Sequence, residues 1–129
     1  MFCVYLLFIL SIFISCSTNK AVVKTSIEEI RFGSGGGFTG KEITYTLNST
    51  GKLTEGEKDL KQIDSKTTLL LFKEAKKNKT YSFNEPQNMY SFIVIQSKDS
   101  TNRIVWGLGS KKINKDITDF HNHLISLTK

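Results

Sequence analysis

The segment from Gly33 to Gly40 holds the residue types and spacing closest to a known chemical motif. Gly35, Gly37 and Gly40 match the pattern G-x-G-x-x-G, in which the glycine backbone approaches a pyrophosphate held at a helix N-terminus. That chemistry needs a helix directly after the glycines. Lys41–Leu47 instead alternates as a half-buried strand does, with Ile43, Tyr45 and Leu47 expected inward and Glu42, Thr44 and Thr46 expected outward. The sequence therefore disfavours a nucleotide site.

Two other interpretations of the glycine-rich segment stay open. It is either a flexible or bulged hairpin connection, in which glycines permit positive φ angles, or a loop of residues 33–40 that presses its backbone against a partner. Binding residues are often carried on loops of a rigid scaffold. The candidate partner-binding residues are Gly35, Gly36, Gly37, Phe38, Thr39 and Gly40.

The two histidines do not predict a metal site. His121 and His123 are two residues apart on an expected helix, so they face different directions. Asp119 and His123 have the spacing of a zinc-binding pair, but two ligands do not make a site. We expect His121 at the edge of the core and His123 at the surface. No spacing orders a Ser-His-Asp triad, so we expect a non-enzymatic protein without catalytic residues, metal ions or cofactors.

The net charge also limits the classes of partner that the chain is expected to bind. The chain of 129 residues has 18 Lys and Arg against 12 Asp and Glu, a net charge of +6. The excess is mostly lysine, and nucleic-acid binding surfaces usually interleave arginine with aromatic residues. We expect no nucleic acid partner. Ordinary solubilising charge and attraction to anionic headgroups or acidic glycans both stay open.

The elements that position these residues follow from hydrophobic periodicity. Asp64 or Ser65 and Asn114 are expected N-caps of two amphipathic helices. The apolar face of the first helix is expected to consist of Leu69, Leu70, Leu71, Phe72 and Ala75. Strands are expected at 27–32, 41–47, 52–54, 89–97 and 103–107, and a loop at 81–88. The order is β-β-(β)-α-β-β-α. We predict an α+β fold, an antiparallel sheet of four to five strands with both helices on one face.

The N-terminus carries a short apolar run, Phe2–Ile14. Its 13 residues are too few to span a membrane but fit the apolar region of a secretory signal. The run ends in Phe13-Ile14-Ser15-Cys16, which resembles the lipobox of bacterial lipoproteins. The resemblance implies that residues 1–15 are a signal peptide, that Cys16 is lipidated with acyl chains such as palmitate, that 16–24 form a tether, and that 25–129 form one domain.

Cysteine content and the residue at position 17 refine this expectation. Cys3 and Cys16 are the only cysteines, so the mature domain would hold no thiol. A Cys3–Cys16 disulfide is the alternative, and it requires the first 15 residues to be retained. Ser17 stands where Asp would favour retention in the inner membrane, so the resemblance implies the outer membrane of a Gram-negative bacterium. We expect a monomer held at the membrane by its lipid.

A second resemblance concerns the domain itself. Gly36-Gly37-Phe38-Thr39-Gly40 follows the first expected strand, and this layout is similar to that of the emfourin-type protease inhibitors. The resemblance implies inhibition of thermolysin-like metalloproteases. The sequence thus predicts a lipid-anchored binding module of the cell envelope that uses the glycine-rich loop to bind an envelope protein. The alternative is a metalloprotease inhibitor.

Overall fold

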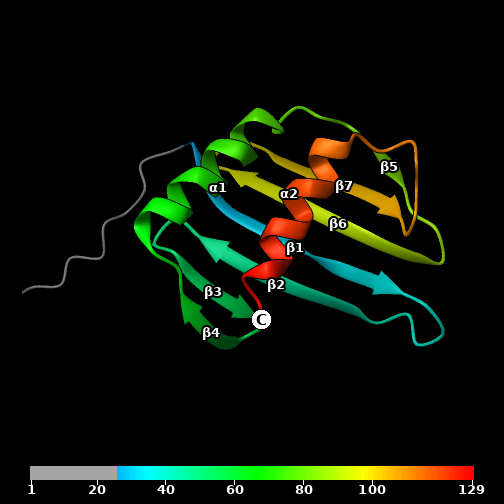
Figure 1. Cartoon of the computed structure of the whole chain (residues 1–129), viewed down its shortest axis with the longest axis horizontal. Helices are drawn as coiled ribbons and strands as arrows, with labels where there is room; N and C mark the ends of the chain where they lie inside the picture. Colours follow the sequence, from blue (N-terminus) through cyan, green and yellow to red (C-terminus); the bar gives the residue numbers. More distant parts are fainter. Residues whose placement is uncertain (1–25) are drawn as a thin grey trace, which may run out of the picture.

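The computed structural model describes residues 26–129 as a seven-stranded sheet with two helices (Figure 1). The predicted signal peptide, Cys16 and the tether lie outside these residues. The helices are α1 (Ser65–Lys77) and α2 (Lys115–Ser126); the strands are β1 (Ile27–Gly36), β2 (Glu42–Asn48), β3 (Lys52–Glu55), β4 (Lys58–Gln62), β5 (Asn84–Glu85), β6 (Met89–Ser97) and β7 (Thr101–Gly107). In this part of the chain no helix is long and apolar enough to cross a membrane.

The α+β class is confirmed, but the sheet is larger than predicted. Its order is β4-β3-β2-β1-β6-β7-β5, against the four to five strands expected. All pairs are antiparallel except β5 and β7, which are parallel, so the sheet is mixed. The two additional strands, β4 and β5, show no hydrophobic periodicity in the sequence. β4 has the polar sequence KDLKQ, and β5 is only two residues long and lies within the expected loop.

Both helices begin at the predicted residues. The Asp64 carboxylate accepts a hydrogen bond from the Thr67 backbone N–H (2.8 Å), and Asn114 Oδ1 accepts one from the Asp116 N–H (2.9 Å). The apolar face expected for α1 is confirmed at Leu71, Phe72 and Ala75 and wrong at Leu69 and Leu70, which are exposed. The buried stripe consists of Thr68, Leu71, Phe72 and Ala75, which have the i, i+3, i+4, i+7 spacing of one helix face.

The core lies between the helices and one face of the sheet. Ile30 and Phe32 of β1 contribute to it with residues from β2, β6, β7 and both helices. Ile27 joins the same core, although the alternation of a regular strand would place it on the opposite face from Ile30. The register shifts between Ile27 and Glu29. Such a bulge adds one residue to the strand and brings Ile27 back to the helix side.

The first strand was expected to end at residue 32, but β1 continues through Gly36. The glycines suit this strand because aromatic rings from β6 lie across it. A Cβ atom on Gly35 would lie 2.5 Å from Tyr90 Oη, and one on Gly33 would lie 3.3 Å from the Phe92 ring and 1.9 Å from the Ile43 carbonyl oxygen. Close approach, rather than a break in the strand, therefore accounts for these two glycines.

Candidate functional site

The β1–β2 turn is a fixed structure rather than a flexible loop. Gly36, Gly37 and Gly40 all have positive φ angles, between 64° and 87°. The Gly36 N–H donates to the Lys41 carbonyl (3.2 Å), and the Gly37 N–H donates to the Asn88 carbonyl (2.8 Å) just before β6. The turn is thus tied to both neighbours of β1. Of the six predicted binding residues, Gly35 and Gly36 lie in the strand and only 37–40 lie in the turn.

Phe38 projects from this turn into solvent. Its relative exposure is 108%, the largest among the exposed apolar side chains of the described residues. Of the turn residues around it, Gly37 and Gly40 have no side chain to cover it. A fully exposed phenylalanine gives no stability to the fold, so its place at a rigid turn favours a role in binding.

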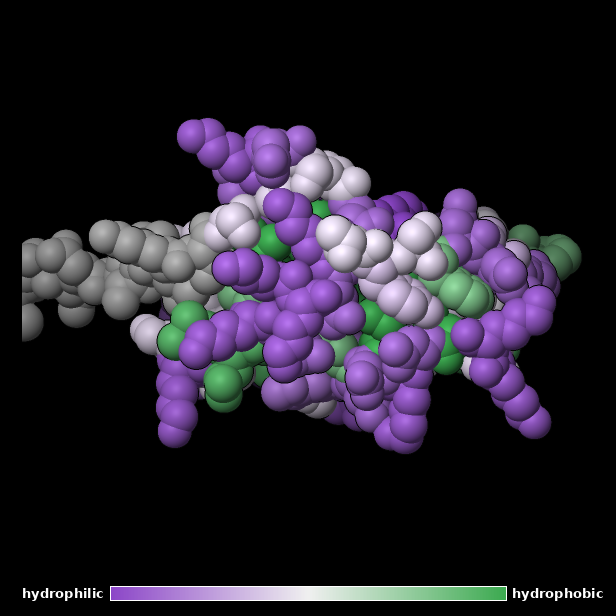
Figure 2. Space-filling model, turned by 90° about the horizontal axis from the view of Figure 1, so that it is seen from above, coloured by the Kyte–Doolittle hydropathy of each residue, from purple (hydrophilic) through white to green (hydrophobic). Residues whose placement is uncertain are grey.

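An apolar groove lies beside the turn, on the helix side of the sheet. The strands extend past the helices at this end (Figure 1), and Ile43, Met89 and Leu108 are therefore about half exposed or more. They line a groove of about 410 Å³ together with Ser34 and Ser91, and Lys41 is its one charged residue. We call Phe38, Ile43, Met89 and Leu108 the tip patch. Figure 2 shows apolar atoms at the surface of this end of the molecule.

A cluster of polar and aromatic side chains holds the turn from the opposite face of the sheet. Glu42 Oε2 accepts hydrogen bonds from Tyr90 Oη (2.7 Å) and Arg103 Nη2 (2.9 Å). The Arg103 guanidinium lies 4.4 Å from the centroid of the Phe92 ring. Glu42 thus reaches across the glycines of β1 to β6 and β7, and it fixes the first residue of β2.

The electrostatics of this cluster favour a permanent ion pair. Partial burial alone would raise the pKa of Glu42, but the hydrogen bonds from Tyr90 and Arg103 lower that pKa below its usual value. The same hydrogen bond to Glu42 raises the pKa of the Tyr90 phenol. Carboxylate and phenol therefore keep their ordinary protonation states at neutral pH, which suits positioning rather than proton transfer.

His121 connects the helix layer to the glycine-rich part of β1. Its Nε2 lies 2.9 Å from the Gly33 carbonyl oxygen, and its ring packs edge-on against Trp106 with centroids 5.1 Å apart. The predicted difference between the histidines is confirmed, because His121 is buried and His123 is exposed. Burial lowers the pKa of His121, although the Gly33 carbonyl partly opposes this.

The lowered pKa of His121 predicts a loss of stability in mild acid. In the unfolded chain the His121 imidazole binds a proton near pH 6.5, whereas in the folded chain it binds that proton only at lower pH. Between these two pKa values the free energy of unfolding falls by about 1.4 kcal/mol per pH unit. We expect urea unfolding to show this fall below pH 6.5. His121→Gln should remove it and His123→Gln should keep it; an unchanged slope in His121→Gln would contradict the assignment.

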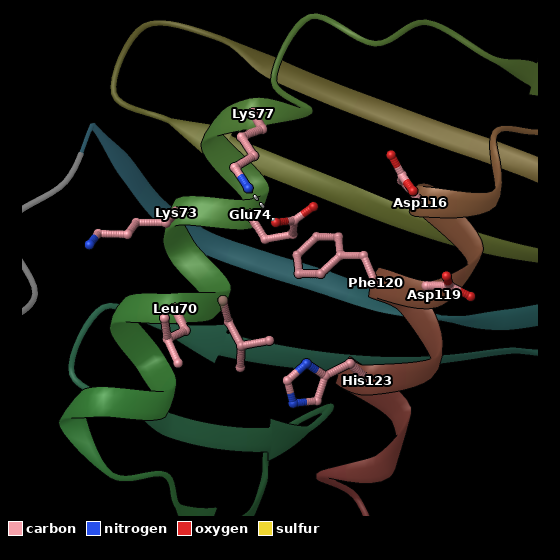
Figure 3. A pocket seen from close by; sticks show the side chains of 9 residues that line it. Leu70, Lys73, Glu74, Lys77, Asp116, Asp119, Phe120 and His123 are labelled. Carbon is pink, nitrogen blue, oxygen red and sulfur yellow. Dashed lines mark hydrogen bonds and ion pairs between the residues drawn. The ribbon is translucent and has the colours of Figure 1, made fainter.

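A second groove, of about 440 Å³, lies between α1 and α2 (Figure 3). Its floor includes Leu71 and Phe120, and Phe120 and His123 point from α2 towards α1. The charged side chains at its rim pair with neighbours on their own helix: Lys77 with Glu74 (3.1 Å), and Asp119 with Lys115. Lys73, Asp116 and His123 also line this groove. Its one aromatic side chain, Phe120, is buried and does not project as Phe38 does, so this groove is a weaker candidate for binding a protein than the tip patch.

The chain has no match among protein-family models, curated proteins or solved structures. Within 26–129, no group of three or more His, Cys, Asp or Glu side chains is arranged to hold a metal ion. Strand β2, not a helix, follows Gly40, which removes the helix N-terminus that a dinucleotide motif requires.

The sequence predicts the turn but not the residues around it. Ile43 was correctly expected on the inner face, yet it is exposed because the sheet extends past the helices. Met89, Leu108 and the Glu42–Tyr90–Arg103 cluster were not predicted. The outward position of Glu42 in an alternating strand was the one available indication, and its partners lie 48 and 61 residues away in the sequence.

Proposed function

We propose that this protein is a lipid-anchored, non-enzymatic binding module of the cell envelope that holds a partner protein through the tip patch. The observation that carries the proposal is Phe38, fully exposed on a turn that is closed by the Gly36–Lys41 hydrogen bond and tied through Gly37 to the residue before β6. A rigid aromatic residue loses little entropy on binding, and such residues dominate the binding energy of many interfaces.

The tip patch fits a protein better than a small molecule. The groove beside Phe38 is open and lined by aliphatic side chains and hydroxyls, with Lys41 as its one charge. A projecting ring next to a shallow apolar groove complements a surface that offers both a pocket and a protruding apolar side chain. Exposed apolar clusters of this kind mark interaction sites in soluble domains.

The direction of β1 supports the anchoring part of the proposal. β1 begins at Ile27, close in sequence to the tether expected from Cys16, and ends at Gly36 beside the turn. Ten residues of strand span about 33 Å. A lipid on Cys16 would therefore attach at one end of the strand, and the tip patch would face away from the bilayer, where a partner protein can reach it.

The alternative function is inhibition of a thermolysin-like metalloprotease. The same turn favours it, because a pre-formed projecting loop can enter an active-site cleft with little rearrangement. The chain carrying Cys16→Ser, which cannot be lipidated, can be assayed directly against thermolysin. Inhibition at micromolar concentration or below would support the inhibitor function, and its absence would leave the binding module as the proposal.

Phe38 is the residue expected to matter most for binding. A photo-crosslinking amino acid at position 38, introduced in cells, should give one discrete adduct with an envelope protein. Position 70 is the control, because Leu70 is an exposed apolar residue on α1, away from the patch. On the captured partner, Phe38→Ala should weaken binding by about 2 kcal/mol or more, with an unchanged unfolding midpoint. Equal adducts from both positions, or unchanged affinity, would contradict the proposal.

A further inference from the structure

Strand β2 extends past its outer neighbour at the tip. β2 covers Glu42–Asn48, but β3 pairs only with residues 45–47. The last hydrogen bond between them runs from the Gly56 N–H to the Thr44 carbonyl oxygen (3.1 Å). The turn between β3 and β4 lies at Gly56, so no strand pairs with the outer side of β2 before Thr44. The first residues of β2 therefore form a short free edge next to the tip patch.

The register shows which backbone groups this edge presents. Successive residues of a strand point their N–H and C=O groups to alternate sides. The Lys41 carbonyl bonds Gly36 of β1, and the Thr44 carbonyl bonds Gly56 on the β3 side. Glu42 is two residues before Thr44, so its N–H and C=O also point to the β3 side, away from β1. Among the described residues, no backbone hydrogen bond reaches either group.

The other sheet edges are protected. The outer strand β4 carries Lys58 and Lys61, and its pairing with β3 is interrupted by a bulge; charged lysines and bulges are common devices against edge pairing. On the other side, the outer strand β5 is only two residues long, which leaves little edge to pair with, and next to it the Asn102 side chain of β7 donates to the Tyr81 carbonyl (2.8 Å). The edge at Glu42 lies between Lys41 and Ile43, which both line the groove.

We propose that the partner adds an extended segment to this edge, pairing its backbone with Glu42. The inference rests on the proposed function and specifies the chemistry of the partner. Lys41 and Ile43 both line the groove and are two residues apart on one face of the sheet. Directly opposite residues on an added strand lie within contact distance. The segment therefore carries an acidic residue opposite Lys41 and an apolar residue opposite Ile43, two positions apart.

The charge of Glu42 does not oppose this pairing. Its carboxylate is held on the other face of the sheet by Tyr90 and Arg103. Lys41 is thus the charged side chain that an added strand meets on the groove side, which favours an acidic residue in the partner. Recognition by strand addition uses backbone hydrogen bonds for affinity and alternate side chains for specificity.

A library of random seven-residue peptides displayed on phage tests the inference on the immobilised Cys16→Ser chain. We expect enriched peptides to share an acidic and an apolar residue two positions apart. Binding of a selected peptide should be about tenfold weaker to Glu42→Pro than to Glu42→Ala, because both variants lose the carboxylate but only proline lacks the N–H. No enriched spacing, or equal affinity for the two folded variants, would overturn the inference.

Amide hydrogen exchange provides a measurement that does not depend on Glu42→Pro folding. In the free protein the Glu42 amide should exchange quickly and the Ile43 amide slowly, and the selected peptide should slow exchange at Glu42 at least tenfold. Unchanged exchange there would also overturn strand addition. If Phe38→Ala weakens binding of the cellular partner while Glu42→Pro matches Glu42→Ala, the proposed function stands and edge pairing is wrong. If Phe38→Ala has no effect, the proposed function itself fails.

Discussion

Gly36→Ala is expected to destabilise the domain by about 3 kcal/mol. A Cβ atom at this position would lie 1.9 Å from the Asn88 carbonyl oxygen, which is held in place by its hydrogen bond from the Gly37 N–H. The clash adds about 1–3 kcal/mol to the strain of a non-glycine residue at a φ of 87°. Thermal unfolding should show a Tm lower by about 10 °C or more.

Gly40→Ala is the matched control for this experiment. Gly40 also has a positive φ, of 64°, but no atom lies within 4 Å of a Cβ placed there. Its replacement therefore introduces only backbone strain, of about 1 kcal/mol. Equal losses of stability in the two variants would mean that the contact with Asn88 does not fix the turn, and the rigid presentation of Phe38 would lose its structural basis.

Cys16→Ser is expected to move the protein from the membrane fraction to the soluble fraction. Each buried CH₂ group of an acyl chain contributes about 0.8 kcal/mol to membrane attachment, and stable anchoring needs more than one chain. Loss of all chains should lower membrane partitioning by about a thousandfold or more. Mass spectrometry of the wild-type N-terminal peptide should show an acylated Cys16 and no residues 1–15.

Cys3→Ser distinguishes lipidation from the alternative disulfide. If Cys16 carries a lipid, Cys3 is removed with the signal peptide, and Cys3→Ser should leave membrane attachment unchanged. If the two cysteines form a disulfide, the two serine variants should behave alike, and the wild-type peptide should still contain residues 1–15. That second result would remove the membrane anchor from the proposed function.

Local interactions made the helices predictable. Asp64 and Asn114 cap them through hydrogen bonds to residues three and two positions later, so the information lies within one turn of sequence. The long strand β6 coincides with the apolar run expected at 89–97. Its alternate residues face two different apolar clusters, with Ile93 in the main core and Phe92 in a smaller cluster on the opposite face. Because both faces of the strand are buried, its sequence is apolar without alternation.

Contacts between distant residues account for what the sequence did not reveal. In the local sequence, Gly33 and Gly35 resemble the end of a strand, because the rings that lie across them belong to Phe92 and Tyr90, more than fifty residues later. Ile27 reaches the core only through a bulge set by its pairing with β6. The tip patch is exposed because the strands of the sheet extend past the two helices. How far they extend depends on how the helices pack on the sheet, and no local sequence pattern encodes that packing.

The central position of β1 also has a mechanical consequence. A protein anchored at one end and holding a partner at the other is placed under tension when the partner moves. β1 lies between β2 and β6 and runs antiparallel to both. A pull along β1 loads both ladders of backbone hydrogen bonds in shear, so many bonds must yield together rather than one after another. The strand that would join tether and turn is thus the one best placed to carry force.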